Sequence, residues 1–210
     1  VLVGNHDLVN NRQFLTTNHW MNGMKEWDNV HVVDKVVSKS FPLKDSITNI
    51  IFLPYVPPGR FQDALMTCDM FKEFINKKPL ENRPSIDLIF AHQEFFGCKM
   101  GAIISTEGDK WPEDYPFIIS GHIHSNQSPQ SNIYYPGSAM QNAFGESEKN
   151  IIPVIELNAN KPFIREINLD LDRKKILYMN TEDVGEYVPT ENKPENVKLS
   201  LSGLYEEFKA

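Results

Sequence analysis

Five side chains that can bind a metal ion stand just after apolar segments of the chain. They are Asn5, His6, His92, His122 and His124. Neutral imidazole nitrogens and an amide oxygen together suit borderline or hard ions such as Mn²⁺, Fe²⁺ or Zn²⁺. His122 and His124 are separated by one residue, so both can point to the same side and bind two adjacent ions. A single histidine after a strand is usually a structural residue. Three apolar segments that are each followed by asparagine or histidine together favour a metal site.

The apolar segments before these residues have the length and the β-branched or aromatic content of buried strands. The predicted strands are Val1–Val3, Ile47–Leu53, Ile86–Ala91, Phe117–Ser120 and Ile151–Leu157. In open α/β sheets, ligands gather at the carboxyl ends of the strands. Three strand ends that carry asparagine and histidine are therefore expected to converge on one site.

Helical spacing of apolar residues predicts a helix over Asp63–Asn76 and a second helix over Asn11–Trp27. Strands that alternate with helices indicate an α/β domain, whereas strand and turn signals dominate after Gly121. We therefore predict a layered α/β fold with mixed sheets. From about Asn180 the composition shifts to Glu, Pro and Asn, which favours a linker into a second module.

The composition is that of a folded protein, with 210 residues, 40% of them apolar, and a net charge of −7. It excludes a disordered chain and argues against a protein that coats nucleic acid through overall positive charge. The apolar segments are far shorter than the roughly 20 residues that cross a bilayer, and no leader opens the chain, so we expect no membrane insertion. The two cysteines suit a reducing compartment. We expect a cytoplasmic or nucleoid-associated protein, or one of the host cytoplasm if the chain is viral.

Three blocks of the sequence resemble, in order, the last three blocks in the signature of the calcineurin-like metallophosphoesterases. They are Gly4-Asn5-His6-Asp7, His92 and Gly121-His122-Ile123-His124. The resemblance implies a layered fold of two mixed β-sheets flanked by helices. It also implies a two-metal site, in which Asn5, His92 and His122 hold one ion and His124 holds the other. His6 would then protonate the leaving group, and Asp7 would orient His6 through a hydrogen bond.

Further segments are similar to the SbcD-like branch of that superfamily, the exonucleases of DNA repair and recombination with their phage counterparts. They are Ile133–Ser138 followed by Phe144–Glu146, and the ending Val197–Lys209, which is similar to the start of a small α+β capping domain. The resemblance implies a metallophosphoesterase (nuclease) domain at 1–179, lacking its first strands, and a linker with the beginning of a capping domain at 180–210. It implies DNA, as double-stranded ends or single strands, an SbcC-type ATPase partner and a homodimer as one option for assembly.

Two divalent ions about 3.5–4 Å apart can hold the attacking and leaving oxygens of a phosphodiester and lower the pKa of a bridging water. Mn²⁺ is the expected ion, with Fe²⁺, Zn²⁺ and Mg²⁺ as alternatives. Asn10 and Arg12 are candidate phosphate contacts, although a polar loop with Asn11 as a helix cap is an equally good interpretation. Phe95 and Phe96 can stack on an unpaired base, but we favour packing beneath the site.

The family signature also has two leading blocks, Asp-x-His and Gly-Asp, which supply the carboxylate that bridges the ions. Only three residues precede Gly4 here. We therefore expect the 210 residues alone to bind metal weakly and to hydrolyse little. Two alternatives stay open. One is a metallophosphoesterase that acts on a small or nucleotide phosphodiester, and the other is a non-catalytic interaction subunit.

Overall fold

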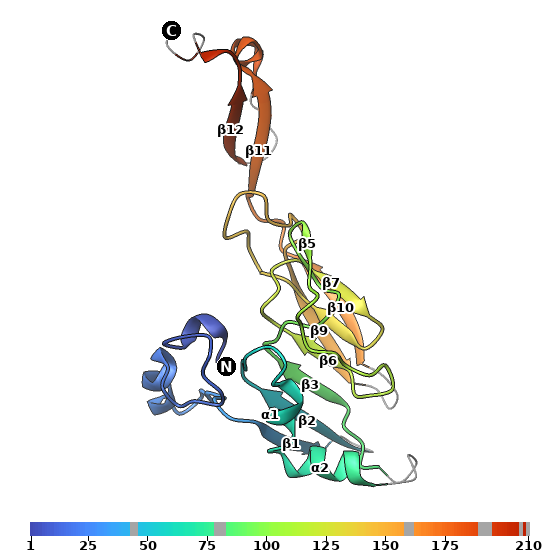
Figure 1. Cartoon of the computed structure of the whole chain (residues 1–210). Helices are drawn as coiled ribbons and strands as arrows, with labels where there is room; N and C mark the ends of the chain where they lie inside the picture. Colours follow the sequence, from blue (N-terminus) through green and yellow to red (C-terminus); the bar gives the residue numbers. More distant parts are fainter. Residues whose placement is uncertain (43–45, 78–82, 158–161, 189–194, 206–207, 209–210) are drawn as a thin grey trace.

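A six-stranded mixed sheet forms the centre of the fold (Figure 1). The computed structural model describes residues 1–42, 46–77, 83–157, 162–188, 195–205 and 208. The strands, in spatial order, are β1 (Val37–Pro42), β2 (Ile47–Leu53), β3 (Leu88–Ala91), β6 (Ile118–Ser120), β8 (Ile133–Tyr135) and β7 (Gln127–Gln130). Strands β2, β3, β6 and β8 run parallel, and β1 and β7 are antiparallel at the two edges. The parallel strands therefore bring their carboxyl ends to one edge of the sheet.

Alternate residues of the central strands pack into two different cores, as the two-residue period of a strand requires. Ile51 and Ile89 belong to a core with the helices α1 (Phe61–Leu65) and α2 (Asp69–Asn76). Ile50 and Leu88 belong to a second core, against which the pair β9 (Ile151–Leu157) and β10 (Pro162–Asn168) packs through Ile155, Leu157 and Ile164. The mixed α/β class is thus confirmed, whereas the layering of the metallophosphoesterase fold stays a prediction.

The strands matched the sequence-based expectation better than the helices did. The helix predicted over Asp63–Asn76 is two helices, because Cys68 adopts an extended conformation (φ −94°, ψ 122°) between α1 and α2. The helix predicted over Asn11–Trp27 is wrong, and only a 3₁₀ helix, η2 (Trp20–Glu26), forms there. The preceding His19 is extended and buried, and its Nε2 lies 3.2 Å from a carboxylate oxygen of Asp34. This tertiary contact outweighs the helical preference that the spacing of the apolar residues indicates.

The strand predicted at Val1–Val3 is reduced to one β-bridge between Leu2 and Val33. Val3 is nevertheless buried, and both of its backbone polar groups are paired: its amide donates to Val33, and its carbonyl accepts a 2.8 Å hydrogen bond from the amide of Tyr55. Tyr55 lies just beyond β2, so this bond fixes the start of the chain at the carboxyl edge of the sheet.

The last part of the chain forms a parallel pair of β11 (Arg173–Asn180) and β12 (Glu195–Ser202), with the 3₁₀ helix η4 (Thr181–Glu186) after β11. This pair lies at the opposite end of the molecule from β1 and α2 (Figure 1). The domain boundary predicted after residue 179 falls one residue before the end of β11. Within the described residues, no helix is long and apolar enough to cross a lipid bilayer.

Candidate metal centre

His92 and His122 meet because they follow neighbouring parallel strands. Strand β3 ends at Ala91 and β6 ends at Ser120, and the amide of Gly121 donates a 2.9 Å hydrogen bond to the carbonyl of Ala91. The two imidazole ring centroids lie 5.4 Å apart, with their planes at 68°. The topology of the sheet thus brings together two histidines that are 30 positions apart in the sequence.

Hydrogen bonds of both its main chain and its side chain fix Gln93, the residue after His92. Gln93 is fully buried, its amide donates to Oγ of Ser120, and its carbonyl accepts from the hydroxyl of Tyr135. Its side chain donates a 2.7 Å hydrogen bond to the buried carboxylate of Asp109. These contacts fix the backbone from which the imidazole of His92 projects.

Asn5 completes the cluster from the start of the chain. It lies in a short 3₁₀ turn, η1 (Asn5–Asp7), and is only 6% exposed. Its side-chain oxygen lies 3.1 Å from Nε2 of His92 and 3.3 Å from Nδ1 of His122. The three side chains that the family resemblance assigns to one ion are therefore adjacent in space.

Two glycines let the backbone approach the ring of His92. A Cβ atom on Gly4 would lie 2.9 Å from both Cε1 and Nε2 of that ring, and one on Gly121 would lie 2.8 Å from Nδ1. A Cβ atom does not approach another heavy atom within 3.0 Å without a shift, so any larger residue at either position displaces the imidazole. Glycine at these two positions is a requirement of the cluster.

His122 has a left-handed backbone conformation, with φ of 76°. Residues other than glycine rarely adopt this conformation, and it costs roughly 1–2 kcal/mol. Such strain is common at functional sites, where the surrounding structure holds a side chain in a required position.

We predict that His122→Gly has a higher free energy of unfolding than His122→Ala by about 1 kcal/mol, because glycine relieves the strain and alanine keeps it. Both variants lack the imidazole, so the comparison isolates the backbone. Urea unfolding followed by circular dichroism measures the difference. Equal stabilities would show that the backbone of residue 122 is not strained.

Both clustered histidines are held in the neutral form. Burial, together with the nearby His122, His6 and His124, lowers the pKa of His92 to about 4. Burial also lowers the pKa of His122, although Glu94 acts in the opposite direction. At neutral pH both rings therefore offer lone pairs, which is the state that binds metal.

The donor atoms of Asn5, His92 and His122 fit a borderline divalent ion. Adjacent ligands of an octahedral ion with bonds of about 2.1 Å lie about 3.0 Å apart, close to the separations seen between these atoms. In the part of the chain that the structure describes, no group of three His, Cys, Asp or Glu side chains is arranged to hold a metal ion. The cluster therefore depends on the amide oxygen of Asn5 as its third donor.

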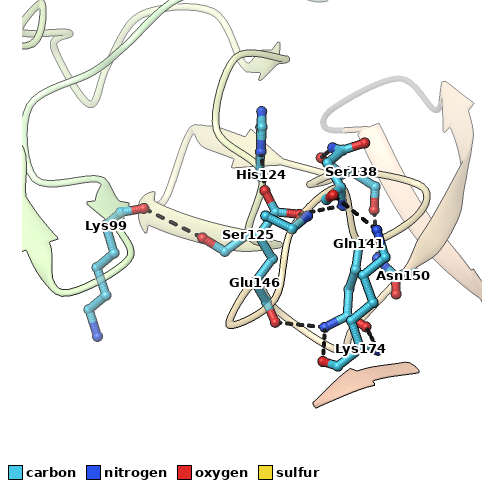
Figure 2. Close-up of polar contacts among 10 residues, drawn as sticks. Lys99, His124, Ser125, Ser138, Gln141, Glu146, Asn150 and Lys174 are labelled. Carbon is cyan, nitrogen blue, oxygen red and sulfur yellow. Dashed lines mark hydrogen bonds and ion pairs between the residues drawn. The ribbon is translucent and has the colours of Figure 1, made fainter. Parts of the chain in front are cut away.

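His124 lies at the edge of a groove of about 700 Å³, and its exposed ring contacts Glu146 rather than the cluster. Its Nδ1 lies 2.8 Å from Oε1 of Glu146 (Figure 2). Burial raises the pKa of Glu146, but hydrogen bonds from His124 and from two backbone amides outweigh it and lower the pKa. Glu146 is thus an ionised acceptor at neutral pH. The groove is lined by residues 99–102, 122–125 and 145–147.

His6 and Asp7 occupy the same short turn as Asn5. The side chain of His6 is exposed, as a group that acts on a bound substrate must be. Asp7 accepts a 2.7 Å hydrogen bond from the amide of Gly4, which closes the turn. Among the residues that the structure describes, no hydrogen bond joins Asp7 to His6, so the orienting role stays a prediction.

The weaker candidates lie outside the cluster. Asn10 and Arg12 are exposed, and the side chain of Asn10 accepts from the amide of Arg12 in a turn, where no helix begins. Phe95 is fully buried against Phe61, as packing beneath the site predicts. For Phe96 that expectation is wrong, since it is 48% exposed, with the ammonium of Lys110 5.3 Å from its ring centroid.

Sequence reasoning missed two residues of this region. Tyr55 lies beside both clustered rings, with centroid distances of 6.4 Å to His92 and 5.9 Å to His122. Glu146 contacts His124 directly, whereas its sequence segment indicates only a resemblance to the SbcD-like branch. Tyr55 had no sequence signal, because its position depends on where β2 ends beside β3.

No protein-family model matches the chain. Two viral proteins are similar to almost all of it. A protein named "Putative phosphoesterase 078R", of Invertebrate iridescent virus 3, is 50% identical over 213 residues, which cover 99% of this chain and 57% of that protein. A protein named "Putative phosphoesterase 244L", of Invertebrate iridescent virus 6, is 44% identical over 216 residues, which cover 100% of this chain and 71% of that protein. The chain thus spans little more than half of the first relative.

Proposed function

The chain belongs to the phosphoesterase family of these iridescent-virus proteins, and on this premise we propose that it is a metal-dependent phosphodiesterase that hydrolyses DNA. The observation that carries the proposal is the cluster of Asn5, His92 and His122, whose donor atoms lie 3.1 and 3.3 Å apart. Neutral donors that converge at the carboxyl edge of a parallel sheet suit a metal ion that polarises a phosphodiester.

In this proposal the cluster holds one divalent ion and His124 contributes to a second, with Mn²⁺ as the expected metal. The bound ions supply a Lewis acid and a water of lowered pKa. The chain's own residues do the rest: His6 donates a proton to the departing oxygen, and Asp7 keeps the turn of His6 closed through Gly4. An SbcC-type ATPase partner, a homodimer and a cytoplasmic location remain parts of the proposal.

A small or nucleotide phosphodiester is the second candidate substrate. The groove beside His124 has a volume of about 700 Å³, which lies within the range of small-molecule sites. We prefer DNA because residues 99–102 line the groove and are exposed to solvent, which suits a substrate that extends beyond the groove. The two substrates differ in size, so a direct comparison of rates separates them.

The test uses the 210-residue chain in excess over labelled duplex DNA, with Mn²⁺ in large excess. We expect slow hydrolysis that requires Mn²⁺, since three neutral donors bind a dication weakly. We expect His92→Ala to abolish it. His31→Ala is the matched control, because His31 is exposed and its hydrogen bond to the amino terminus of Val1 uses the main-chain carbonyl, which alanine keeps.

Parallel assays with bis-p-nitrophenyl phosphate and cyclic nucleotides complete the design. Faster turnover of the small diesters than of DNA would favour the second candidate. No hydrolysis of any substrate with excess Mn²⁺, or hydrolysis that His92→Ala leaves unchanged, would contradict both and favour a non-catalytic interaction subunit.

A further inference from the structure

We propose that Glu146 is a positioning residue that holds His124 in the tautomer whose Nε2 is free to bind a metal ion. The inference rests on the proposed function, since it gives Glu146 a part in the same site. It starts from the 2.8 Å contact between Oε1 of Glu146 and Nδ1 of His124. An ionised carboxylate can only accept hydrogen bonds, so Nδ1 must carry the proton. The lone pair of the neutral ring is then on Nε2.

The carboxylate of Glu146 is itself fixed by the backbone. Its second oxygen, Oε2, accepts hydrogen bonds of 2.6 Å from the amide of Asn142 and 3.2 Å from the amide of Ala143. One oxygen is thus occupied by a turn and the other faces the imidazole. A carboxylate held at both oxygens orients a histidine more strictly than a mobile surface glutamate does.

The buried Gln141 anchors this turn to the first residues of β11. Its side-chain nitrogen donates to the carbonyls of Glu146 at 2.9 Å and Lys174 at 3.2 Å, and its oxygen accepts from the amide of Lys174 at 2.7 Å. Figure 2 shows Glu146, Gln141 and Lys174 in one connected network. The turn that carries Glu146 is therefore part of the folded structure, not a free loop.

The backbone of His124 is held from the other side. Its carbonyl accepts a 2.8 Å hydrogen bond from the amide of Ser138, and the carbonyl of Ser138 accepts from the side chain of Asn150. With its main chain fixed by Ser138 and its ring fixed by Glu146, His124 has one orientation relative to the groove. Such outer contacts of a ligand typically contribute roughly 10- to 100-fold in metal affinity or activity.

The ring tautomer is read directly by ¹⁵N chemical shifts of His124 in mildly alkaline buffer, without metal or substrate. In the unsubstituted chain we expect the proton on Nδ1. In Glu146→Gln the amide oxygen stays on the two backbone amides and the amide nitrogen donates to Nδ1, so we expect the proton on Nε2. Glu146→Asp keeps an acceptor and should retain part of the Nδ1–H form.

Glu148→Gln is the matched control. It removes the same charge two residues along the chain, where Glu148 makes an exposed 3.0 Å ion pair with Arg173. We expect it to leave the tautomer of His124 and the rate of hydrolysis unchanged. Glu146→Gln should lower the Mn²⁺-dependent rate by roughly 10- to 100-fold, with recovery in Glu146→Asp.

The proposal is overturned if Glu146→Gln leaves the proton of His124 on Nδ1, or if the unsubstituted chain hydrolyses substrate and Glu146→Gln does so at the same rate as Glu148→Gln. If the chain hydrolyses no substrate, the proposed function is contradicted. The tautomer of His124 in Glu146→Gln still tests whether Glu146 positions that ring. The two failures are therefore distinguishable.

Discussion

Replacement of His6 by alanine is expected to lower DNA hydrolysis by roughly 10²- to 10⁴-fold, the usual contribution of a general acid. The departing sugar oxygen is a poor leaving group and needs a proton, which the exposed His6 donates in the proposed mechanism. Metal binding should be largely retained, because the donor atoms of Asn5, His92 and His122 remain. Single-turnover cleavage of labelled DNA measures the rate, and a calorimetric Mn²⁺ titration measures binding.

The choice of substrate sharpens this prediction. The p-nitrophenolate ion leaves without a proton, so His6→Ala should hydrolyse bis-p-nitrophenyl phosphate at close to the rate of the unsubstituted chain. A loss of the same size on both substrates would contradict the general-acid role. Equal losses of hydrolysis and of Mn²⁺ binding would show instead that His6 is a ligand or a structural residue.

Replacement of Gly121 by alanine is expected to abolish Mn²⁺ binding and to lower the free energy of unfolding by about 1–3 kcal/mol, the usual cost of overpacking. The added Cβ would lie 2.8 Å from Nδ1 of His92. The ring of His92 cannot move away freely, because Gly4 also lies close to it. In addition, hydrogen bonds with Ser120, Tyr135 and Asp109 fix the neighbouring residue Gln93. His92 must therefore leave its place beside Asn5 and His122.

Gly23→Ala is the matched control for this variant. Gly23 lies in η2, and a Cβ atom there would have no neighbour within 4 Å. Its free energy of unfolding and Mn²⁺ binding should stay close to those of the unsubstituted chain. Urea unfolding and the same Mn²⁺ titration test both variants. If Gly121→Ala bound Mn²⁺ as well as Gly23→Ala, His92 would not be a ligand.

The sequence allowed the central strands and the residues of the cluster to be predicted for a physical reason. A buried strand is a short apolar segment, and Ile47–Leu53 and Ile151–Leu157 have the predicted bounds. A glycine, alanine or serine step followed by a polar residue that can bind a metal ion, as at Ala91-His92 and Gly121-His122, marks where such a strand ends. Because parallel neighbours share an edge, the positions of His92 and His122 follow from the strands alone.

The helices could not be predicted as well, since local spacing competes with contacts made far along the chain. The segment Asn11–Trp27 has apolar residues at helical spacing, yet His19 is buried and its side chain contacts the carboxylate of Asp34. Lys25 adds a 2.5 Å ion pair to the same carboxylate. A single buried acceptor thus sets the conformation of a segment whose own preference was weak.

The sequence by itself determined which residue types end the strands, and hence the kind of chemistry that the chain can support. Only the tertiary structure decided how those residues are held. It placed Asn5 beside His92 through the bond between Val3 and Tyr55, and it paired His124 with Glu146 through a turn anchored on β11. The reason is that strand ends follow a short-range pattern, whereas a hydrogen bond between residues far apart in sequence depends on how the whole chain packs.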